Sequence, residues 1–124
     1  MPKASSSTGT EKDFGVAVDR TTVVDGYSIS FTSIRQTHDL APILAALPAG
    51  NCTCPHWGYV LKGKITIRYG DHEEAVTAGE AFYMPPGHAP AAEAGTELIQ
   101  FSPADQLAAV EQAIMAATQP GSPP

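Results

Sequence analysis

The sequence predicts a small antiparallel β domain, either a barrel or a sandwich. Three observations support this class. The chain has 124 residues, which is enough for one domain. It contains 11 glycines and 11 prolines, above the average usage of about 12% for the two together. Short segments of alternating apolar and polar residues are separated by turn sequences, a pattern typical of all-β folds.

The N-terminal half of the chain is expected to hold an arm, two strands and a short helix. Residues 1–13 offer little to bury, so we expect them to form a flexible arm. Strand patterns follow at residues 14–18 and 27–34. Asp39 has the right chemistry to cap a short apolar helix over residues 40–47, which a proline and a glycine end.

The C-terminal half shows stronger strand patterns and one longer helix. The strands expected here cover residues 57–61, 65–69, 74–77, 81–84 and 97–101. A final helix is expected from about Ala104, with three apolar side chains on one face: Leu107, Val110 and Ile114. The domain is therefore expected to span residues 14–118, followed by a flexible tail over residues 119–124.

The charge distribution argues against nucleic acid and membrane surfaces as partners. The chain has 7 Lys and Arg against 13 Asp and Glu, for a net charge of −6. All the basic residues lie within residues 1–68, and an acidic surface repels phosphate groups and anionic lipid. No apolar run reaches the roughly 18 residues needed to span a bilayer. The N-terminus lacks the apolar stretch of a secretory signal, so we expect a cytoplasmic protein.

Three of the cysteine and histidine side chains lie close together in the sequence: Cys52, Cys54 and His56. Thiols of an intracellular protein are more often reduced or bound to metal than joined in a disulfide. Residues 52 and 56 of a straight strand are roughly 13 Å apart, too far for one metal ion with bonds of about 2.0–2.3 Å. Cys54 and His56 are therefore the safer pair, and Cys52 depends on a bend near Pro55.

Residues 50–90 resemble the two sequence motifs of the cupin family. The second motif, G-x5-P-x-G-x2-H-x3-N, matches at Gly79, Pro85 and Gly87, and the first, G-x5-H-x-H-x3-4-E-x6-G, matches at its final Gly63. The resemblance implies an antiparallel jelly-roll β-barrel with a short helix before the metal motif and a C-terminal helix.

The chain departs from the family pattern at the positions that usually bind metal. In the register set by Gly63, His56 stands at the family's Glu position and Cys52 at the position of its second His. The first His position is occupied by Gly50. His88 lies two residues before the His position of the second motif, on the same side of a strand.

These departures, read together with the spacing, imply a new set of metal ligands: Cys52, Cys54, His56 and His88. Two thiolates and two imidazoles suit zinc, with copper as a competitor, whereas the family's usual three His and one Glu suit iron, manganese or nickel. The alternative is that the site has lost its metal and that these side chains only line the barrel.

Three classes of function stay open at this point. The chain could be a metal-dependent enzyme acting on a small molecule, a metal- or ligand-sensing or storage module without turnover, or a domain held together by a structural zinc site. Four protein ligands would fill the zinc tetrahedron and favour a structural or sensing role, whereas three would leave a position free for catalysis. The sequence names no substrate and no catalytic residue.

A symmetric homodimer is predicted for the chain. The family resemblance implies pairing through strands or a sheet face. Independently, a small antiparallel fold leaves edge strands that must be covered, and dimers of this symmetry are the most common soluble oligomers. Apolar and polar residues alternate poorly over residues 14–18, as in a strand buried on both faces by a partner. The alternative is a monomer in which residues 14–18 extend the chain's own sheet.

Overall fold

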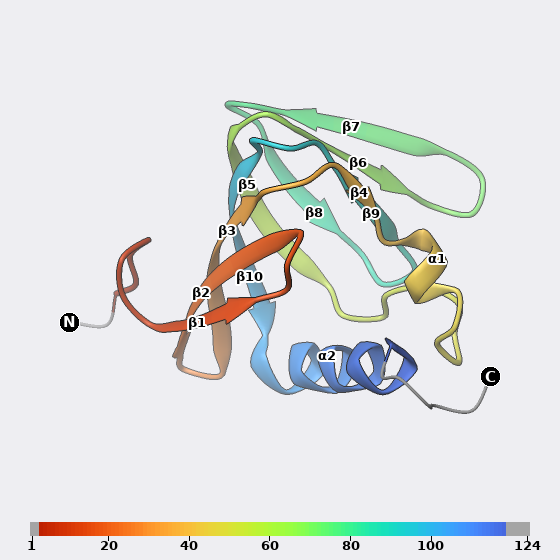
Figure 1. Ribbon diagram of the computed structural model, residues 1–124, viewed down its shortest axis with the longest axis horizontal. Helices are drawn as coiled ribbons and strands as arrows, with labels where there is room; N and C mark the ends of the chain where they lie inside the picture. The colour runs from red at the N-terminus through yellow and green to blue at the C-terminus, as the bar shows by residue number, and fades with distance from the viewer. Residues whose placement is uncertain (1–2, 119–124) are drawn as a thin grey trace.

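The computed structural model describes residues 3–118 and is built mainly from antiparallel strands (Figure 1). Its elements, in chain order, are β1 (Thr10–Asp13), β2 (Ala17–Val24), β3 (Tyr27–Ile34), β4 (His38–Asp39), α1 (Ala41–Leu44), β5 (His56–Lys62), β6 (Lys64–Arg68), β7 (Glu73–Thr77), β8 (Ala81–Met84), β9 (Ala89–Ala92), β10 (Glu97–Pro103) and α2 (Ala104–Thr118).

The strands form two separate antiparallel sheets. The larger sheet has the order β1-β2-β3-β10-β5-β8, and the smaller has the order β4-β9-β6-β7. The strands from β3 onward pair in a nested pattern, because β3 pairs with β10, β4 with β9, β5 with β8 and β6 with β7. Hydrogen bonds within the described residues do not join the two sheets into one closed barrel.

The main hydrophobic core lies between the inner faces of the two sheets. On β6, for example, Ile65 and Ile67 are buried while the residues between them are not, as expected for a strand with one buried face. Each fully buried side chain of this kind contributes roughly 1.5–3 kcal/mol to stability. The members of this core are Val60, Phe82, Met84 and Leu98 of the larger sheet and Ile65, Ile67 and Val76 of the smaller sheet.

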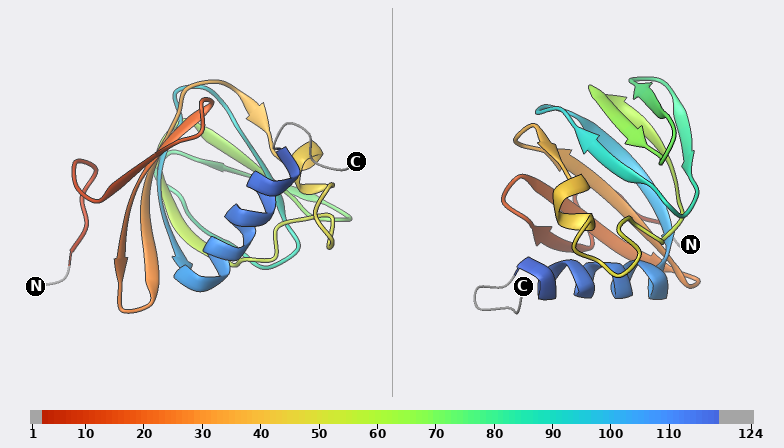
Figure 2. Two further views of the ribbon diagram at one scale, coloured as in Figure 1. Left: turned by 60° about the horizontal axis from the view of Figure 1, so that its bottom comes forward. Right: turned by 90° about the vertical axis from the view of Figure 1, so that its right-hand side faces the viewer.

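A second, smaller core lies beneath the two helices. The side chain of Leu44 on α1 packs there with Cys52 and Cys54, and one face of α2 covers them with Leu107, Val110 and Ile114. The helix begins at Ala104, as the sequence predicts, and lies across one end of the sheets (Figures 1 and 2). Within residues 3–118, neither helix is long and apolar enough to cross a membrane.

The N-terminal region differs from the sequence-based expectation. Residues 10–13, expected in a flexible arm, form strand β1, which pairs with β2 at the edge of the larger sheet. Lys12 joins this strand to α2 through an ion pair with Glu111, 2.9 Å from Nζ to Oε1. The strand expected at residues 14–18 starts only at Ala17, because a turn precedes it. The tail predicted at residues 119–124 lies outside the described residues.

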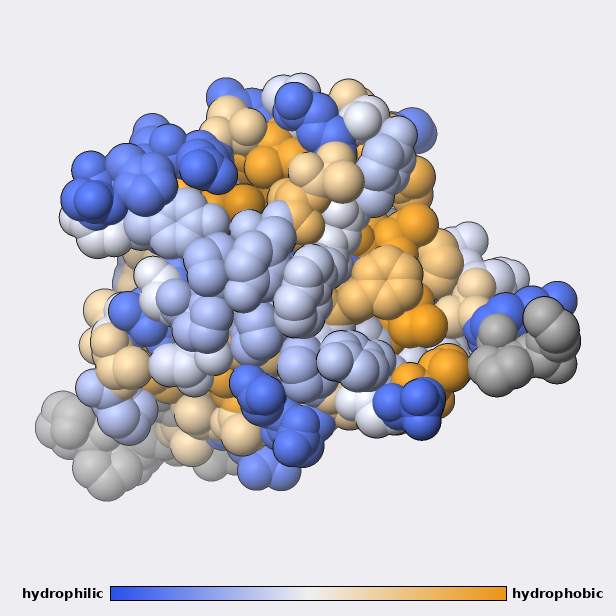
Figure 3. Space-filling model, turned by 180° about the vertical axis from the view of Figure 1, so that it is seen from behind, coloured by the Kyte–Doolittle hydropathy of each residue, from blue (hydrophilic) through white to orange (hydrophobic). Residues whose placement is uncertain are grey.

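The outer face of the larger sheet carries exposed aromatic side chains. Trp57 on β5 is 42% exposed and Tyr83 on β8 is 48% exposed, and their rings stack with centroids 5.0 Å apart. Tyr59 and Phe101, on the neighbouring positions of β5 and β10, are exposed to a similar degree. Viewed from behind, the molecule shows exposed hydrophobic surface between paler and polar residues (Figure 3).

Candidate metal centre

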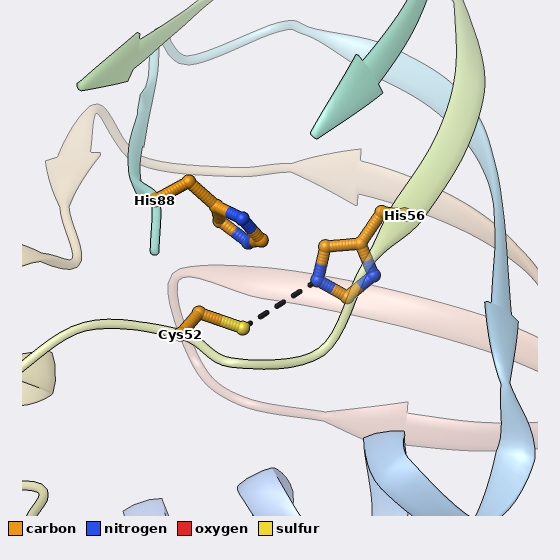
Figure 4. A group of neighbouring side chains, drawn as sticks. All are labelled: Cys52, His56 and His88. Carbon is orange, nitrogen blue, oxygen red and sulfur yellow. Dashed lines mark hydrogen bonds between the residues drawn. The ribbon is translucent and has the colours of Figure 1, made fainter. Parts of the chain in front are cut away.

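Three buried side chains meet between the sheets and the helices: Cys52, His56 and His88 (Figure 4). One potential ligand atom from each residue lies within 4.8 Å of the other two. His56 is the first residue of β5, Cys52 lies in the loop that leads to it, and His88 directly precedes β9. The structure therefore brings three of the four sequence-predicted ligands close enough together to hold one metal ion.

The backbone fixes Cys52 beside His88 through a short antiparallel bridge. The amide of Cys52 donates to the carbonyl oxygen of His88 at 2.9 Å, and the amide of Gly87 donates back to the carbonyl oxygen of Cys52 at 2.8 Å. Gly87 has a φ of 100°, a conformation that other residues rarely adopt. The Pro-Pro-Gly sequence that marks the second motif thus serves to place one ligand against another.

Hydrogen bonds to the second ring nitrogen orient both imidazoles. The Nδ1 atom of His88 lies 2.6 Å from the carbonyl oxygen of Pro85, which can only accept, so this nitrogen carries the proton. The Nε2 atom of His88 then presents a lone pair, and it is buried without a hydrogen-bond partner among the described residues. The Nδ1 atom of His56 pairs with the hydroxyl of Ser102, and its Nε2 atom lies 3.6 Å from the sulfur of Cys52.

The surroundings keep both imidazoles neutral. Burial, with a smaller contribution from the charge of His88, lowers the pKa of His56 to about 3. Burial also lowers the pKa of His88, although its hydrogen bond to Pro85 acts in the opposite direction. A neutral imidazole is the form that binds metal.

Burial shifts the pKa of the Cys52 thiol in the opposite direction from the pKa of the two imidazoles. Burial raises the pKa of Cys52, and a hydrogen bond to the backbone of Cys54 partly offsets this effect. Without a cation nearby, the thiol therefore keeps its proton at neutral pH. A bound metal ion would have to displace that proton, because the thiolate is the form that coordinates.

Cys54 does not join the cluster. Its thiol donates to the carbonyl oxygen of Pro55 at 3.5 Å, and the residue is fully buried beside Leu44. Burial, followed by the charge of Cys52, raises the pKa of Cys54 to about 12. The expectation that Cys54 and His56 form the safer pair is thus not met. The chain bends at Cys54, and this bend brings Cys52 close to His56.

The cluster lies in the wall of a cavity of about 470 Å³. The cavity is lined by residues of both sheets, α1 and α2, and its lining is mostly apolar. Its volume lies within the range of roughly 300–1,000 Å³ typical of small-molecule sites. The potential ligand atoms of the cluster are therefore next to a space that a small molecule could fill.

Two residues of this site were not identified from the sequence as part of it. Ser102 appears in the sequence only as a residue near the start of the final helix, yet its hydroxyl orients His56 from the neighbouring strand β10. Asp19 stands on β2 and lines the cavity. Only the pairing of distant strands reveals either role, so no local sequence signal could have found them.

Comparisons with known proteins agree with the fold. Residues 53–96 match the family model of the cupin domain. The polyketide cyclase RemF from Streptomyces resistomycificus is 15% identical, with a TM-score of 0.60 over 84% of this chain and 80% of that chain. A cupin superfamily protein from Desulfitobacterium hafniense is 14% identical, with a TM-score of 0.55 over 71% and 77%.

An RmlC-like cupin from Shewanella frigidimarina is also similar, with 16% identity and a TM-score of 0.55 over 81% of this chain and 88% of that chain. At these identities the likeness shows a shared fold alone. No curated protein matches the chain by sequence.

Proposed function

Because this chain belongs to the cupin family, we propose that it is a metal-binding cupin that binds one transition-metal ion and a small molecule in the adjoining cavity. The ligands are Cys52, His56 and His88. The nested pairing of strands β3 to β10 supports a jelly-roll arrangement in which the two facing sheets act as the wall of a barrel around this cavity.

One observation carries the proposal: the unpartnered Nε2 atom of His88 points into a buried cluster with a second imidazole and a thiol. A buried polar atom without a hydrogen bond costs roughly 1–3 kcal/mol, so such atoms in native proteins usually have a partner. A metal ion is the partner that would satisfy all three atoms together. The hydrogen bonds on the other nitrogen of each imidazole support this assignment, because metal-binding histidines are usually held in this way.

The donor set favours zinc. One thiolate and two imidazoles suit zinc, and copper is the competitor, whereas iron, nickel and manganese sites usually contain more oxygen or nitrogen ligands. A zinc ion with three protein ligands keeps a fourth position, where it can acidify a water molecule or polarise a carbonyl group. The unpaired thiols fit a reducing compartment, and we propose a cytoplasmic location.

Three ligands beside a cavity favour binding or conversion of a small molecule over a purely structural zinc. The chain's own residues bury the three candidate ligands, orient both imidazoles and line the adjoining space with mostly apolar side chains. The second candidate is a non-catalytic sensing or storage module, or a structural zinc site. It is favoured by the complete burial of His88 and the low exposure of Cys52 and His56.

Elemental analysis of the full chain, purified without chelator from a metal-replete culture, tests the proposal. We expect about one zinc per chain, and loss of the metal in a His88→Ala variant. His72→Ala, in an exposed turn, is the matched control and should keep the metal. Metal-free wild-type protein would refute the proposal.

A second measurement separates the two candidates. Circular dichroism after metal removal should show a folded chain if the ion serves a small molecule. Unfolding on metal removal would instead support the structural role.

A further inference from the structure

The cavity beside the metal centre has a second polar site on β2. Asp19 lies on the inner face of this strand, in the same row of side chains as Ala17 and Thr21. Its carboxylate lines the cavity together with Thr32 on β3, the residue directly opposite in the strand pairing. Most of the remaining lining is apolar.

Asp19 has a hydrogen-bond donor but forms no ion pair among the described residues, although the charge of Lys12 acts on it from a distance. The hydroxyl of Thr32 donates to its Oδ1 atom at 2.7 Å. The nearby ammonium of Lys12 forms its ion pair with Glu111 instead, at 2.9 Å. Within residues 3–118, no ion pair involves Asp19. Burial, in spite of the hydrogen bond from Thr32, raises the pKa of Asp19.

When Asp19 is ionised, this arrangement leaves one excess negative charge in the cavity wall. Glu111 also lines the cavity, so two carboxylates face it with the single ammonium of Lys12 beside them. A desolvated carboxylate without a partner cation is unfavourable, because one hydrogen bond does not replace its hydration. A positively charged group of a ligand would restore the balance, whereas an anionic ligand would be repelled.

Asp19 and the metal centre stand on different parts of the same wall. In the larger sheet, β2 is separated from β5, which carries His56, by β3 and β10. Three strand spacings correspond to roughly 14 Å measured along the sheet, and the cavity extends past both sites. Between them the lining is mixed, because β10 contributes the apolar Leu98 and the polar Gln100. The cavity thus has a polar group at each end, and its lining as a whole is mostly apolar.

We propose that this cavity binds an apolar small molecule that carries a basic amino group, and that Asp19 is the residue that recognises the ammonium. The carboxylate accepts charge-assisted hydrogen bonds from the ammonium, and the apolar body of the ligand extends toward Cys52, His56 and His88. The orientation of the ligand's apolar part toward these three residues rests on the proposed function. The recognition of the amine by Asp19 does not require the metal.

Isothermal titration calorimetry with two matched probes tests this inference. The probes are 2-phenylethylamine and 2-phenylethanol, which share their apolar part and differ in the charged group. We expect the full-length chain to bind the amine at least about tenfold more tightly than the alcohol, as one charge-assisted hydrogen bond would give. Equal binding of the two probes, or no binding of either, would overturn the proposal.

Two variants assign the preference to Asp19. Asp19→Asn keeps the shape and an acceptor for Thr32 but removes the charge, so amine affinity should fall about tenfold while alcohol affinity stays the same. Asp25→Asn, in the exposed turn after the same strand, is the matched control and should bind both probes like the wild type. An unchanged amine affinity in Asp19→Asn would contradict the proposal.

A third variant covers the case in which Asp19→Asn fails to fold. Glu111→Gln removes the partner of Lys12, which can then pair with Asp19, so amine binding should weaken in this variant too. If Asp19→Asn is unfolded, unchanged amine affinity in Glu111→Gln refutes the proposal.

The result of the amine-binding experiments can be distinguished from the result of the metal-binding experiment. Elemental analysis should find the same zinc content in Asp19→Asn as in the wild type, and His88→Ala should lose zinc yet still prefer the amine. Amine selectivity without any metal would uphold the role of Asp19 and refute the proposed function. Bound metal without amine selectivity would support the proposed function and refute the role of Asp19.

Discussion

The Nδ1 atom of His56 lies 2.7 Å from the Oγ atom of Ser102, on the neighbouring strand β10. Ser102 is almost completely buried, so water cannot replace its hydroxyl. The hydrogen bond holds the ring so that its Nε2 atom faces Cys52. Ser102 thus orients His56 in the candidate metal centre.

A Ser102→Ala variant should bind zinc about 10- to 100-fold more weakly, because such supporting hydrogen bonds fix the orientation and basicity of a metal-binding imidazole. Competition with a chromophoric chelator measures the change. Ser33→Ala, on the exposed outer face of β3, is the control and should leave the affinity unchanged. Equal affinities in the two variants would show that Ser102 does not position the ligand.

The two cysteines are predicted to behave differently, although they are two residues apart. Cobalt substituted for zinc should give a thiolate charge-transfer band in the wild type, because one thiolate coordinates. Cys52→Ser should lose this band, since a serine hydroxyl is a poor ligand at neutral pH. Cys54→Ser should keep it, because the Cys54 thiol faces the backbone of Pro55 and the side chain of Leu44. Loss of the band in both variants would restore Cys54 as a ligand.

Acid should destabilise the metal-free protein through its two buried histidines. The pKa of His56 is lowered to about 3 and that of His88 is also lowered, in both cases chiefly by burial. In the unfolded chain both groups titrate near pH 6.5. Below that pH the unfolded state binds protons that the folded state does not, so the stability present above about pH 6.5 is lost as the pH falls toward about 3.

Each histidine contributes a slope of at most about 1.4 kcal/mol per pH unit. Urea unfolding of the metal-free protein between about pH 7 and pH 4 measures this slope. A His56→Gln variant should show a smaller slope than the wild type. The same slope in both proteins would contradict the prediction.

The chain is predicted to form a symmetric homodimer. Phe14 lies before β2 and is half exposed, so a contribution of residues 14–18 to the interface stays a prediction. The outer face of the larger sheet is a second candidate surface for a partner copy, since Trp57, Tyr83 and Phe101 are exposed there side by side. Burial of this aromatic face would remove apolar area from water on both copies.

Sedimentation equilibrium at micromolar concentration should give twice the chain mass of 12.9 kDa. Trp57→Glu should shift the protein toward the monomer, whereas Val23→Glu, at an exposed position near the end of β2, should not. A wild-type protein that sediments at the mass of one chain would refute the dimer.

Most strands were predictable because their local patterns agree with their environment. Residues 27–34 and 81–84 are strands with the predicted bounds. By contrast, β9 was missed, because Pro90 cannot donate to a ladder and makes its sequence unlike a strand. β1 was missed because its polar residues are stabilised by pairing with β2 and by an ion pair with distant Glu111, which no local pattern reveals.

The candidate site was predictable in its residue types but not in its geometry. The alternation of Cys52, Cys54 and His56 suggests a metal site, and the family register adds His88. Spacing along a straight strand, however, favours Cys54, whereas the bend at Cys54 places Cys52 beside His56 in the structure. The roles of distant side chains such as Ser102 depend on strand pairing, so they became visible only in the folded chain.

The nested pairing of strands also constrains the order in which the strand pairs can form during folding. β6 and β7 are joined by a short turn and can pair after closing a small loop. β3 and β10 set Ser33 opposite Glu97, so their pairing closes a loop that contains the other nested pairs. The entropic cost of closure grows with loop length, and folds dominated by distant contacts fold in roughly milliseconds to seconds. We therefore expect the cavity, which needs both sheets, to be among the last features to form.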